Sequence, residues 1–284
     1  MGLTININGS TVKIGFPAVM GILNITPDSF YDGGFYPTMD AQLKQVERML
    51  NEGAAIIDIG AVSTRPGAAQ VSEDEELSKL LPVVDAVKKY FPDCIASIDT
   101  YRSAVAGIAV DHGASIINDI YGGGFDRKMI DLVVSKNVPV ILMHMQGTPE
   151  TMQAAPHYYD VVAEIHDFFK ERISNFPPGY KSLMIDPGFG FGKTVEHNFR
   201  LLANLKRFRD LGYPIVAGLS RKSMINKVLR IKPEEALNGT TALNTIALLN
   251  GADILRVHDV KEAIESVKLV QAFRTQGILP GFTP

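Results

Sequence analysis

The stretch I-A-S-I-D-T-Y-R-S-A-V-A-G-I-A-V-D-H-G-A-S-I-I-N-D, residues 95–119, contains the repeating unit that decides the fold. An apolar run at 95–98 precedes a segment at 102–112 whose apolar residues have the spacing of a helix. Gly113 then supplies a left-handed cap, and a second apolar run begins at Ser115. This order predicts a strand, a helix and a second strand parallel to the first.

The same unit recurs along the chain. Eight apolar runs occupy residues 18–23, 55–59, 95–98, 115–117, 138–143, 183–185, 214–219 and 253–257. Helices are expected at 40–51, from 72 onward, at 102–112, 126–136, 159–175 and 194–210, as an interrupted pair within 221–250, and at 260–273. Eight such units predict an α/β protein, a single (β/α)8 TIM barrel. A doubly wound open sheet is the alternative, but no break in composition divides the chain, so residues 1–284 are expected to form one domain.

Residues 3–16 precede the first unit and differ from it in pattern. Two short alternating runs flank Asn8-Gly9, a dipeptide typical of two-residue hairpin turns. We therefore expect an N-terminal β-hairpin that closes the bottom of the barrel.

The composition is that of an ordinary globular protein. Hydrophobic residues make up 46% of the 284 residues and charged residues 21%, which excludes a disordered or collagen-like chain. With 28 basic and 31 acidic residues the formal charge is −3, so no nucleic-acid partner is expected. The single cysteine, Cys94, excludes an internal disulfide and fits a core position. The sequence shows neither a signal peptide nor a membrane-spanning run, so a cytoplasmic protein with no membrane partner is expected.

Polar residues follow the apolar runs, and barrel strands bring the residues at their carboxyl ends to one mouth. Asn24, Asp99, Asn118, Asp186 and Arg256 each stand directly against an apolar run, where burial is costly without a ligand or partner. Asp99, Asn118 and Asp186 form an acceptor-rich array. Such an array suits a flat heterocycle that presents several N–H donors along one edge.

Cations gather at the last two strand ends. They are Arg221, Lys222, Arg256 and His258. The loops after the seventh and eighth strands are the common phosphate site of this fold, so the cations predict a bound phosphate group.

The motif G-F-G-F-G-K-T at 188–194 resembles a P-loop without completing it, because Pro187 stands where the pattern requires glycine. Its glycines are expected to let the backbone approach a ligand closely. The six histidines lack the spacing of a zinc site, and His144 is expected to be a hydrogen-bonded core residue.

Eight motifs, in order along the chain, resemble the dihydropteroate synthase family. They are M-G-I-L-N-I-T-P-D-S-F at 20–30, S-T-R-P-G-A at 63–68, S-I-D-T at 97–100, I-I-N-D-I at 116–120, L-M-H-M-Q-G at 142–147, I-D-P-G-F-G-F-G-K at 185–193, G-L-S-R-K-S-M-I at 218–225 and R-V-H-D-V-K-E at 256–262. The resemblance implies a barrel enzyme of folate biosynthesis. It would condense 6-hydroxymethyl-7,8-dihydropterin diphosphate with 4-aminobenzoate, giving 7,8-dihydropteroate and diphosphate, with Mg²⁺ as cofactor. It also implies a homodimer and inhibition by sulfonamides.

Carried over residue by residue, the resemblance implies which side chains bind the first substrate, the dihydropterin diphosphate. The pterin edge would meet Asp99, Asn118, Asp186 and Lys222. The diphosphate would lie against Arg256, His258 and Arg65, with Asn24 at the Mg²⁺.

The second substrate and the catalytic loops follow from the same resemblance. Aminobenzoate would stack near Phe30, Pro66 and Phe191, with its carboxylate at Ser223 and the start of a helix, and Thr64 near both substrates. Loops at 26–36 and 63–70 would close over the site. Asp32 would stabilise a cationic pterin, and Asp32, Arg65 and Lys222 would form the catalytic set. Val62 departs from the family, many of whose members have an acidic residue there.

Three alternatives remain open from the sequence. A methyltetrahydrofolate-type methyltransferase domain would share the acceptor array but would not need the cation cluster of Ser220-Arg221-Lys222 with Arg256 and His258. A non-catalytic pterin-binding paralogue should have lost loop residues such as Asp32 and Arg65, which are present. A sugar-phosphate enzyme would explain the cations but not the acceptor array.

Overall fold

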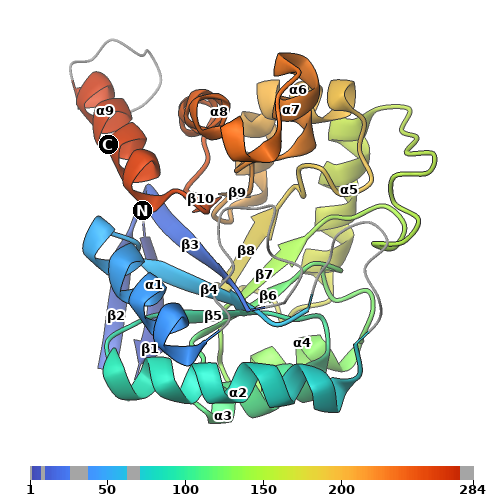
Figure 1. The fold of residues 1–284 in the computed structure, drawn as a ribbon. Coiled ribbons are helices and arrows are strands. Elements are labelled where there is room, and N and C mark those ends of the chain that lie inside the picture. Colours follow the sequence, from blue (N-terminus) through green and yellow to red (C-terminus); the bar gives the residue numbers. More distant parts are fainter. Residues whose placement is uncertain (1, 8–9, 26–37, 63–70, 276–284) are drawn as a thin grey trace.

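The computed structural model describes residues 2–7, 10–25, 38–62 and 71–275 (Figure 1). Eight parallel strands form its central sheet, and their order in the sheet is β8-β7-β6-β5-β4-β3-β10-β9. The strands are β3 (Ala18–Asn24), β4 (Ile56–Gly60), β5 (Ala96–Asp99), β6 (Ile116–Asp119), β7 (Val140–Met143), β8 (Leu183–Asp186), β9 (Val216–Ala217) and β10 (Ile254–Val257). Each lies on one of the eight apolar runs of the sequence.

The sheet closes on itself between β8 and β9. Ile185 pairs in parallel with Ile215, just before β9, and the Ile185 amide donates to the carbonyl of Pro214 at 3.0 Å. Because closure removes both sheet edges, the architecture is the predicted (β/α)8 barrel rather than the open sheet.

Helices surround the barrel in Figure 1. They are α1 (Met39–Glu52), α2 (Glu73–Tyr90), α3 (Ser103–Asp111), α4 (Lys128–Ser135), α5 (Val161–Ser174), α6 (Val195–Ala203), α7 (Ser223–Leu229), α8 (Leu237–Leu249) and α9 (Val260–Thr275), with the 3₁₀ turns η2 (Leu205–Leu211) and η3 (Pro233–Glu235). The expected helix at 194–210 is divided at Asn204, whose side chain donates to the Arg200 carbonyl at 2.8 Å. Such a local bond competes with regular helix geometry. None of the helices in the described part is long and apolar enough to cross a membrane.

The N-terminal hairpin is present as predicted. Strands β1 (Gly2–Ile7) and β2 (Ser10–Gly15) pair antiparallel, with Gly2 opposite Gly15 and Ile7 opposite Ser10. Ile14 is buried in the barrel's apolar floor, so β2 closes the bottom of the barrel.

The barrel floor is a layer of inward-facing apolar side chains, which we call the lower layer. Its members are Ile14, Ala18, Met20, Ile56, Ile95, Ile116, Ile141, Met184, Val216 and Ile254. Side chains on the opposite face of each strand pack against the helices, in a larger core that includes Cys94. Cys94 is buried in this core, as predicted, and burial raises the pKa of its thiol to about 12.

Candidate active site

A second layer lies above the lower layer on the same strands. Because side chains of a strand alternate between its faces, the residue two positions after a lower-layer residue also points into the barrel. Ile56 is followed in this way by Asp58, Ile116 by Asn118, Met184 by Asp186, and Ile254 by Arg256. Asp99 joins them because it pairs with Asn118 across the β5–β6 register. We call Asp58, Asp99, Asn118, Asp186 and Arg256 the upper layer.

Arg256 links the upper layer across the barrel. Its Nε donates to Asp58 Oδ2 at 2.7 Å, and its Nη2 donates to Asp99 Oδ2, also at 2.7 Å. Asn118 Nδ2 donates to the same Asp58 oxygen at 3.0 Å. Three of the five predicted strand-end residues therefore meet, together with one aspartate that the sequence analysis did not select.

Asp58 was not selected from the sequence because it falls inside the apolar run at 55–59 rather than directly after it. It lies in the middle of β4, fully buried, between Ile57 and Ile59. Its Oδ1 has no hydrogen-bond partner among the described residues, so a buried acceptor remains available to a donor. A lone charge inside an otherwise apolar strand was the signal that could have revealed it, because a buried charge requires a partner.

Burial dominates the electrostatics of the upper layer. It raises the pKa of Asp99 to about 7, against the opposing effect of Arg256 and with the help of the Asp58 charge. Burial also raises the pKa of Asp186, although the Gly188 N–H and the Lys222 charge oppose the shift. Gly188 donates to Asp186 Oδ1 at 2.8 Å and so orients this carboxyl group. For Arg256, burial acts to lower the pKa, but Asp58 and Asp99 outweigh it and raise the pKa, so the guanidinium stays charged.

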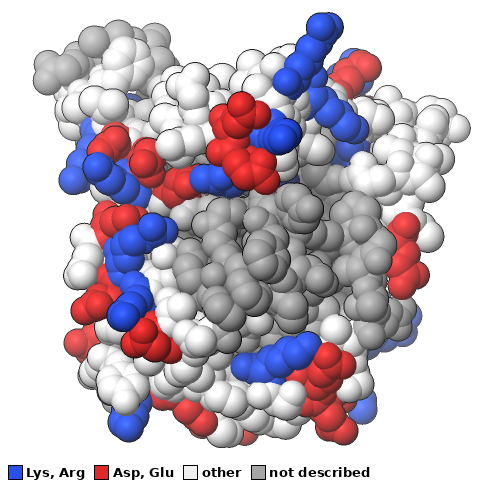
Figure 2. Space-filling view, viewed as in Figure 1, with Lys and Arg blue, Asp and Glu red and all other residues white. Residues whose placement is uncertain are grey.

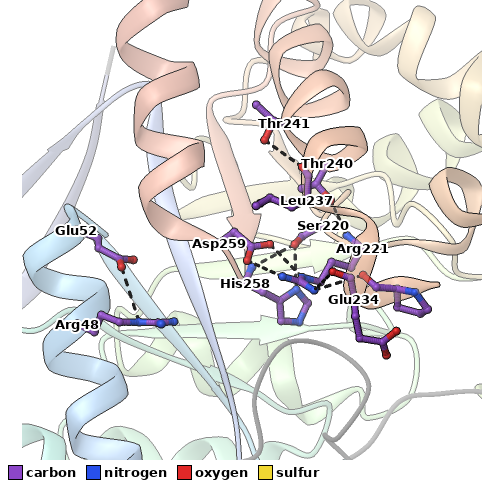
Figure 3. A network of polar contacts seen from close by, with 11 residues as sticks. Arg48, Glu52, Ser220, Arg221, Glu234, Leu237, Thr240, Thr241, His258 and Asp259 are labelled. Atoms are coloured by element: carbon purple, nitrogen blue, oxygen red, sulfur yellow. Dashed lines mark hydrogen bonds and ion pairs between the residues drawn. The ribbon is translucent and has the colours of Figure 1, made fainter. Parts of the chain in front are cut away.

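Two of the predicted cations lie at the rim of the barrel. Lys222 precedes α7, and its Nζ lies 4.3 Å from the ring centroid of Phe191, a cation–π distance. His258 follows β10, and its Nδ1 lies 3.0 Å from Ser220 Oγ (Figure 3). Ser223 is the first residue of α7 and is exposed. Lys222, Ser223 and Phe191 are thus brought to one side of the rim.

Arg221 departs from the expected group of cations. Its guanidinium makes a two-point ion pair with Asp259, with Nε and Nη2 at 3.0 and 2.8 Å from the carboxylate (Figure 3). Its Nη1 donates to the carbonyls of Pro233 and Glu234, both at 3.3 Å, and its amide donates to Thr240 Oγ1. This arginine therefore connects the ends of β10 and η3 and has a structural role.

Asn24 ends β3 beside the upper layer. A Cβ built on Gly60 would lie 3.4 Å from Asn24 Oδ1 and 3.8 Å from Asp99 Oδ2, so both oxygens border the same small space. Within the described residues no three His, Cys, Asp or Glu side chains group as a metal site. Any cation here would therefore depend on Asn24 together with oxygens of a ligand.

Two glycines of the 188–192 turn lie against the backbone of the neighbouring segment at 144–146. Gly188 and Gly192 have positive φ angles of 70° and 63°. A Cβ on Gly188 would lie 2.0 Å from the His144 carbonyl oxygen, and one on Gly192 would lie 2.5 Å from that of Gln146. The glycines allow backbone to approach backbone, so the expectation that they face a ligand was wrong at these two positions.

Five predicted site residues lie outside the described residues. They are Phe30, Asp32, Thr64, Arg65 and Pro66, within 26–37 and 63–70. In the view of Figure 2, acidic and basic side chains of the described residues lie close to one another, without a broad area of one sign.

Comparisons with known proteins agree with this geometry. The family model described as "Pterin binding enzyme" matches residues 20–258. The chain is 45% identical over 267 residues to the dihydropteroate synthase of Escherichia coli, covering 93% of this chain and 94% of that protein. The structure of Yersinia pestis dihydropteroate synthase with a sulfonamide drug complex superposes with a TM-score of 0.90 at 43% identity, covering 97% of this chain and 100% of the other. The Xanthomonas albilineans enzyme with 4-aminobenzoic acid gives a TM-score of 0.86 at 40% identity, over 96% and 99% of the two chains.

Proposed function

This chain belongs to the dihydropteroate synthase family of pterin-binding enzymes, and from that membership we propose how its side chains divide the two substrates. The enzyme is a transferase of folate biosynthesis. It joins 6-hydroxymethyl-7,8-dihydropterin diphosphate to 4-aminobenzoate, releases diphosphate, and is a target of sulfonamides. The observation that carries the assignment is the buried upper layer of acceptors, with the cation of Lys222 at its rim.

The upper layer receives the amino-pyrimidinone edge of the pterin. Asp186, fixed by the Gly188 amide, accepts parallel N–H bonds from this edge, and Asn118 and Asp99 complete the array. Arg256 holds Asp99 and Asp58 in place before the ligand arrives. Such preorganisation reduces the entropy that binding costs.

Cations receive the diphosphate end. His258 at the rim, Arg256 behind it and Arg65 from the 63–70 segment offset the negative charge that grows as the C–O bond breaks, while Lys222 lies beside the pterin edge. Arg256 serves both ends of the substrate in this proposal, because it already contacts the acceptors.

The residues fit a magnesium ion at Asn24. Mg²⁺ prefers hard oxygen ligands and is commonly held by one or two protein oxygens together with substrate phosphates. The Asn24 amide oxygen supplies one such protein oxygen, and the substrate diphosphate would supply the others. When bound, the ion would neutralise charge on the leaving diphosphate.

Aminobenzoate occupies the side of the rim that carries Phe191, with its carboxylate at Ser223. Phe30, Pro66 and Thr64 are proposed to complete this subsite. The reacting nitrogen is an aniline, which is neutral and nucleophilic at pH 7, so no strong base is required. It forms the new C–N bond with the pterin methylene, the C–O bond electrons leave with diphosphate, and the surplus N–H proton passes to solvent. Asp32 stabilises positive charge on the pterin as the bond breaks.

Further features belong to the same proposal. Residues 1–284 form one pterin-binding domain, and two copies of it form a homodimer in the cytoplasm. Size measurements by light scattering check the dimer.

The direct test of the function is diphosphate release. We expect purified enzyme with Mg²⁺ and the dihydropterin diphosphate to release diphosphate in step with 4-aminobenzoate consumption. Without aminobenzoate the release should fall to background. Release that is independent of aminobenzoate would contradict the proposed assignment of the second substrate.

A further inference from the structure

The turn after β8 carries Phe191 to the rim but is fixed from beneath by a residue with no role so far. Lys193 lies only 3% exposed below this turn. Its Nζ donates to the Gly188 carbonyl at 2.8 Å and to the Phe191 carbonyl at 2.9 Å. A single ammonium therefore ties the first and fourth residues of the turn together.

The third donor of Lys193 meets His144. The distance from Nζ to His144 Nδ1 is 3.1 Å. Burial, with the charge of Lys193, lowers the pKa of His144 well below its usual value, so the imidazole is neutral. When the proton is on Nε2, Nδ1 accepts a bond from Lys193, and all three N–H donors of the ammonium have partners. His144 also packs edge-on against Phe168, with ring centroids 4.9 Å apart, which confirms the expected core histidine.

Other side chains hold the rest of the turn. Asn198 Oδ1 accepts from the Gly190 amide at 2.7 Å, and Gln153 Nε2 donates to the Gly190 carbonyl. Tyr158 donates to the Gly192 carbonyl at 3.0 Å. The Phe191 carbonyl accepts its bond from Lys193. This lysine therefore fixes the backbone of the residue whose ring faces Lys222.

We propose that Lys193 is a positioning residue for the aminobenzoate subsite: by holding the Phe191 carbonyl, it fixes the Phe191 ring against the Lys222 ammonium. The inference rests on the proposed function, which places aminobenzoate beside Phe191. Lys193 itself touches no substrate. A buried lysine is costly, and burial lowers its pKa to about 7. An apolar residue would leave the part-buried Phe191 carbonyl without this donor, and the Gly188 carbonyl with the Phe191 amide, which donates to it at 3.2 Å.

The first test separates the two substrates. In Lys193→Met the KM for 4-aminobenzoate should rise about tenfold, the size of a lost aromatic contact with its supporting geometry. The affinity for a bare pterin, measured by calorimetry, should change by less than about twofold, because Asp186 and Asn118 are untouched. Lys181→Met is the matched control, since Lys181 is exposed, and it should change neither quantity. An unchanged KM, or an equal loss of pterin affinity, would overturn the proposal.

A double-mutant cycle excludes a merely structural role. If Lys193 acts through the Phe191 ring, Lys193→Met should raise the KM by less than about twofold in a Phe191→Leu background. Equal effects in both backgrounds would overturn the route through Phe191. If Lys193→Met does not fold, Lys193→Gln, which retains a shorter polar side chain, takes its place. It should likewise raise the KM for 4-aminobenzoate and leave the pterin affinity unchanged.

A second readout needs no substrate. The chain contains no tryptophan, so Phe191→Trp introduces a single fluorescent reporter at the turn. Adding Lys193→Met should increase acrylamide quenching of this tryptophan while the melting curve stays cooperative. Unchanged quenching contradicts the role of Lys193, whereas a wild-type enzyme without aminobenzoate-dependent turnover contradicts only the proposed function.

Discussion

The lower and upper layers of the barrel are built by the same strands but have opposite chemistry. Ile116 and Met184 belong to the apolar floor, while Asn118 and Asp186, two positions later, belong to the polar layer. Along one strand, a residue that stabilises the fold and a residue that binds a ligand are therefore only two positions apart. A barrel strand can therefore change its ligand chemistry at its carboxyl end without losing the floor beneath it.

The two layers also differ in what burial does to stability. Burial of the floor removes apolar surface from water and stabilises the fold. Burial of the upper layer desolvates carboxylates, as the raised pKa values of Asp99 and Asp186 record. Arg256 offsets this cost through its bonds to Asp58 and Asp99. The site is thus stabilised by its own pairing, and the following predictions test each layer separately.

The largest loss of stability is expected when Arg256, the cation of the upper layer, is replaced. Arg256→Met should lower the free energy of unfolding by about 3–5 kcal/mol near pH 8, because two buried carboxylates lose their partner. The loss should be smaller near pH 5, where Asp99 can protonate. Denaturant unfolding at both pH values measures it, with the exposed Arg207→Met as control. A loss no larger than that of the control would mean that the pairing of Arg256 does not stabilise the layer.

A floor substitution should affect stability but not chemistry. Ile116→Ala should lower the free energy of unfolding by about 2–4 kcal/mol, because it leaves a cavity in a fully buried layer. The kcat/KM per folded molecule should stay within about threefold of wild type, since no upper-layer contact is removed. Steady-state kinetics at a temperature well below the melting point decide the matter. A large fall in kcat/KM would show that the two layers are coupled.

A further effect concerns the dependence of stability on pH. Between about pH 4 and pH 7 the folded protein binds more protons than the unfolded chain, because burial raises the pKa of Asp99 to about 7 and that of Asp119 to about 6. The unfolding free energy contributed by these groups should therefore fall as pH rises through this interval. In Asp99→Asn the fall should be smaller, because the Asp99 carboxyl no longer titrates. Identical pH profiles for the two proteins would refute the buried-carboxylate explanation.

Much of this organisation was predictable from the sequence. Apolar runs with a polar residue at the end predicted the strands, and parallel strand ends predicted that Asp99, Asn118 and Arg256 would converge. Asn8-Gly9 predicted the hairpin. These features depend on local spacing, which the sequence contains directly.

Features that depend on contacts between distant segments were not predictable in the same way. Asp58 was not selected because its place in the polar layer of the barrel follows from strand register, which the sequence does not specify. The pairing of Arg221 with Asp259 brings together residues 38 positions apart. Gly188 and Gly192 fitted a ligand motif, but the backbone atoms that they approach belong to His144 and Gln146.

The most direct test compares how substitutions in the two layers change the affinity for a pterin. Calorimetry with a bare pterin should show that Asp186→Asn weakens binding by about 1.5–3 kcal/mol, roughly ten- to a hundredfold, because a neutral amide cannot accept both N–H bonds. Ile116→Val, two strands away in the floor, should leave the affinity unchanged within about twofold. Equal affinity of wild type and Asp186→Asn would contradict the claim that the upper layer binds the pterin edge.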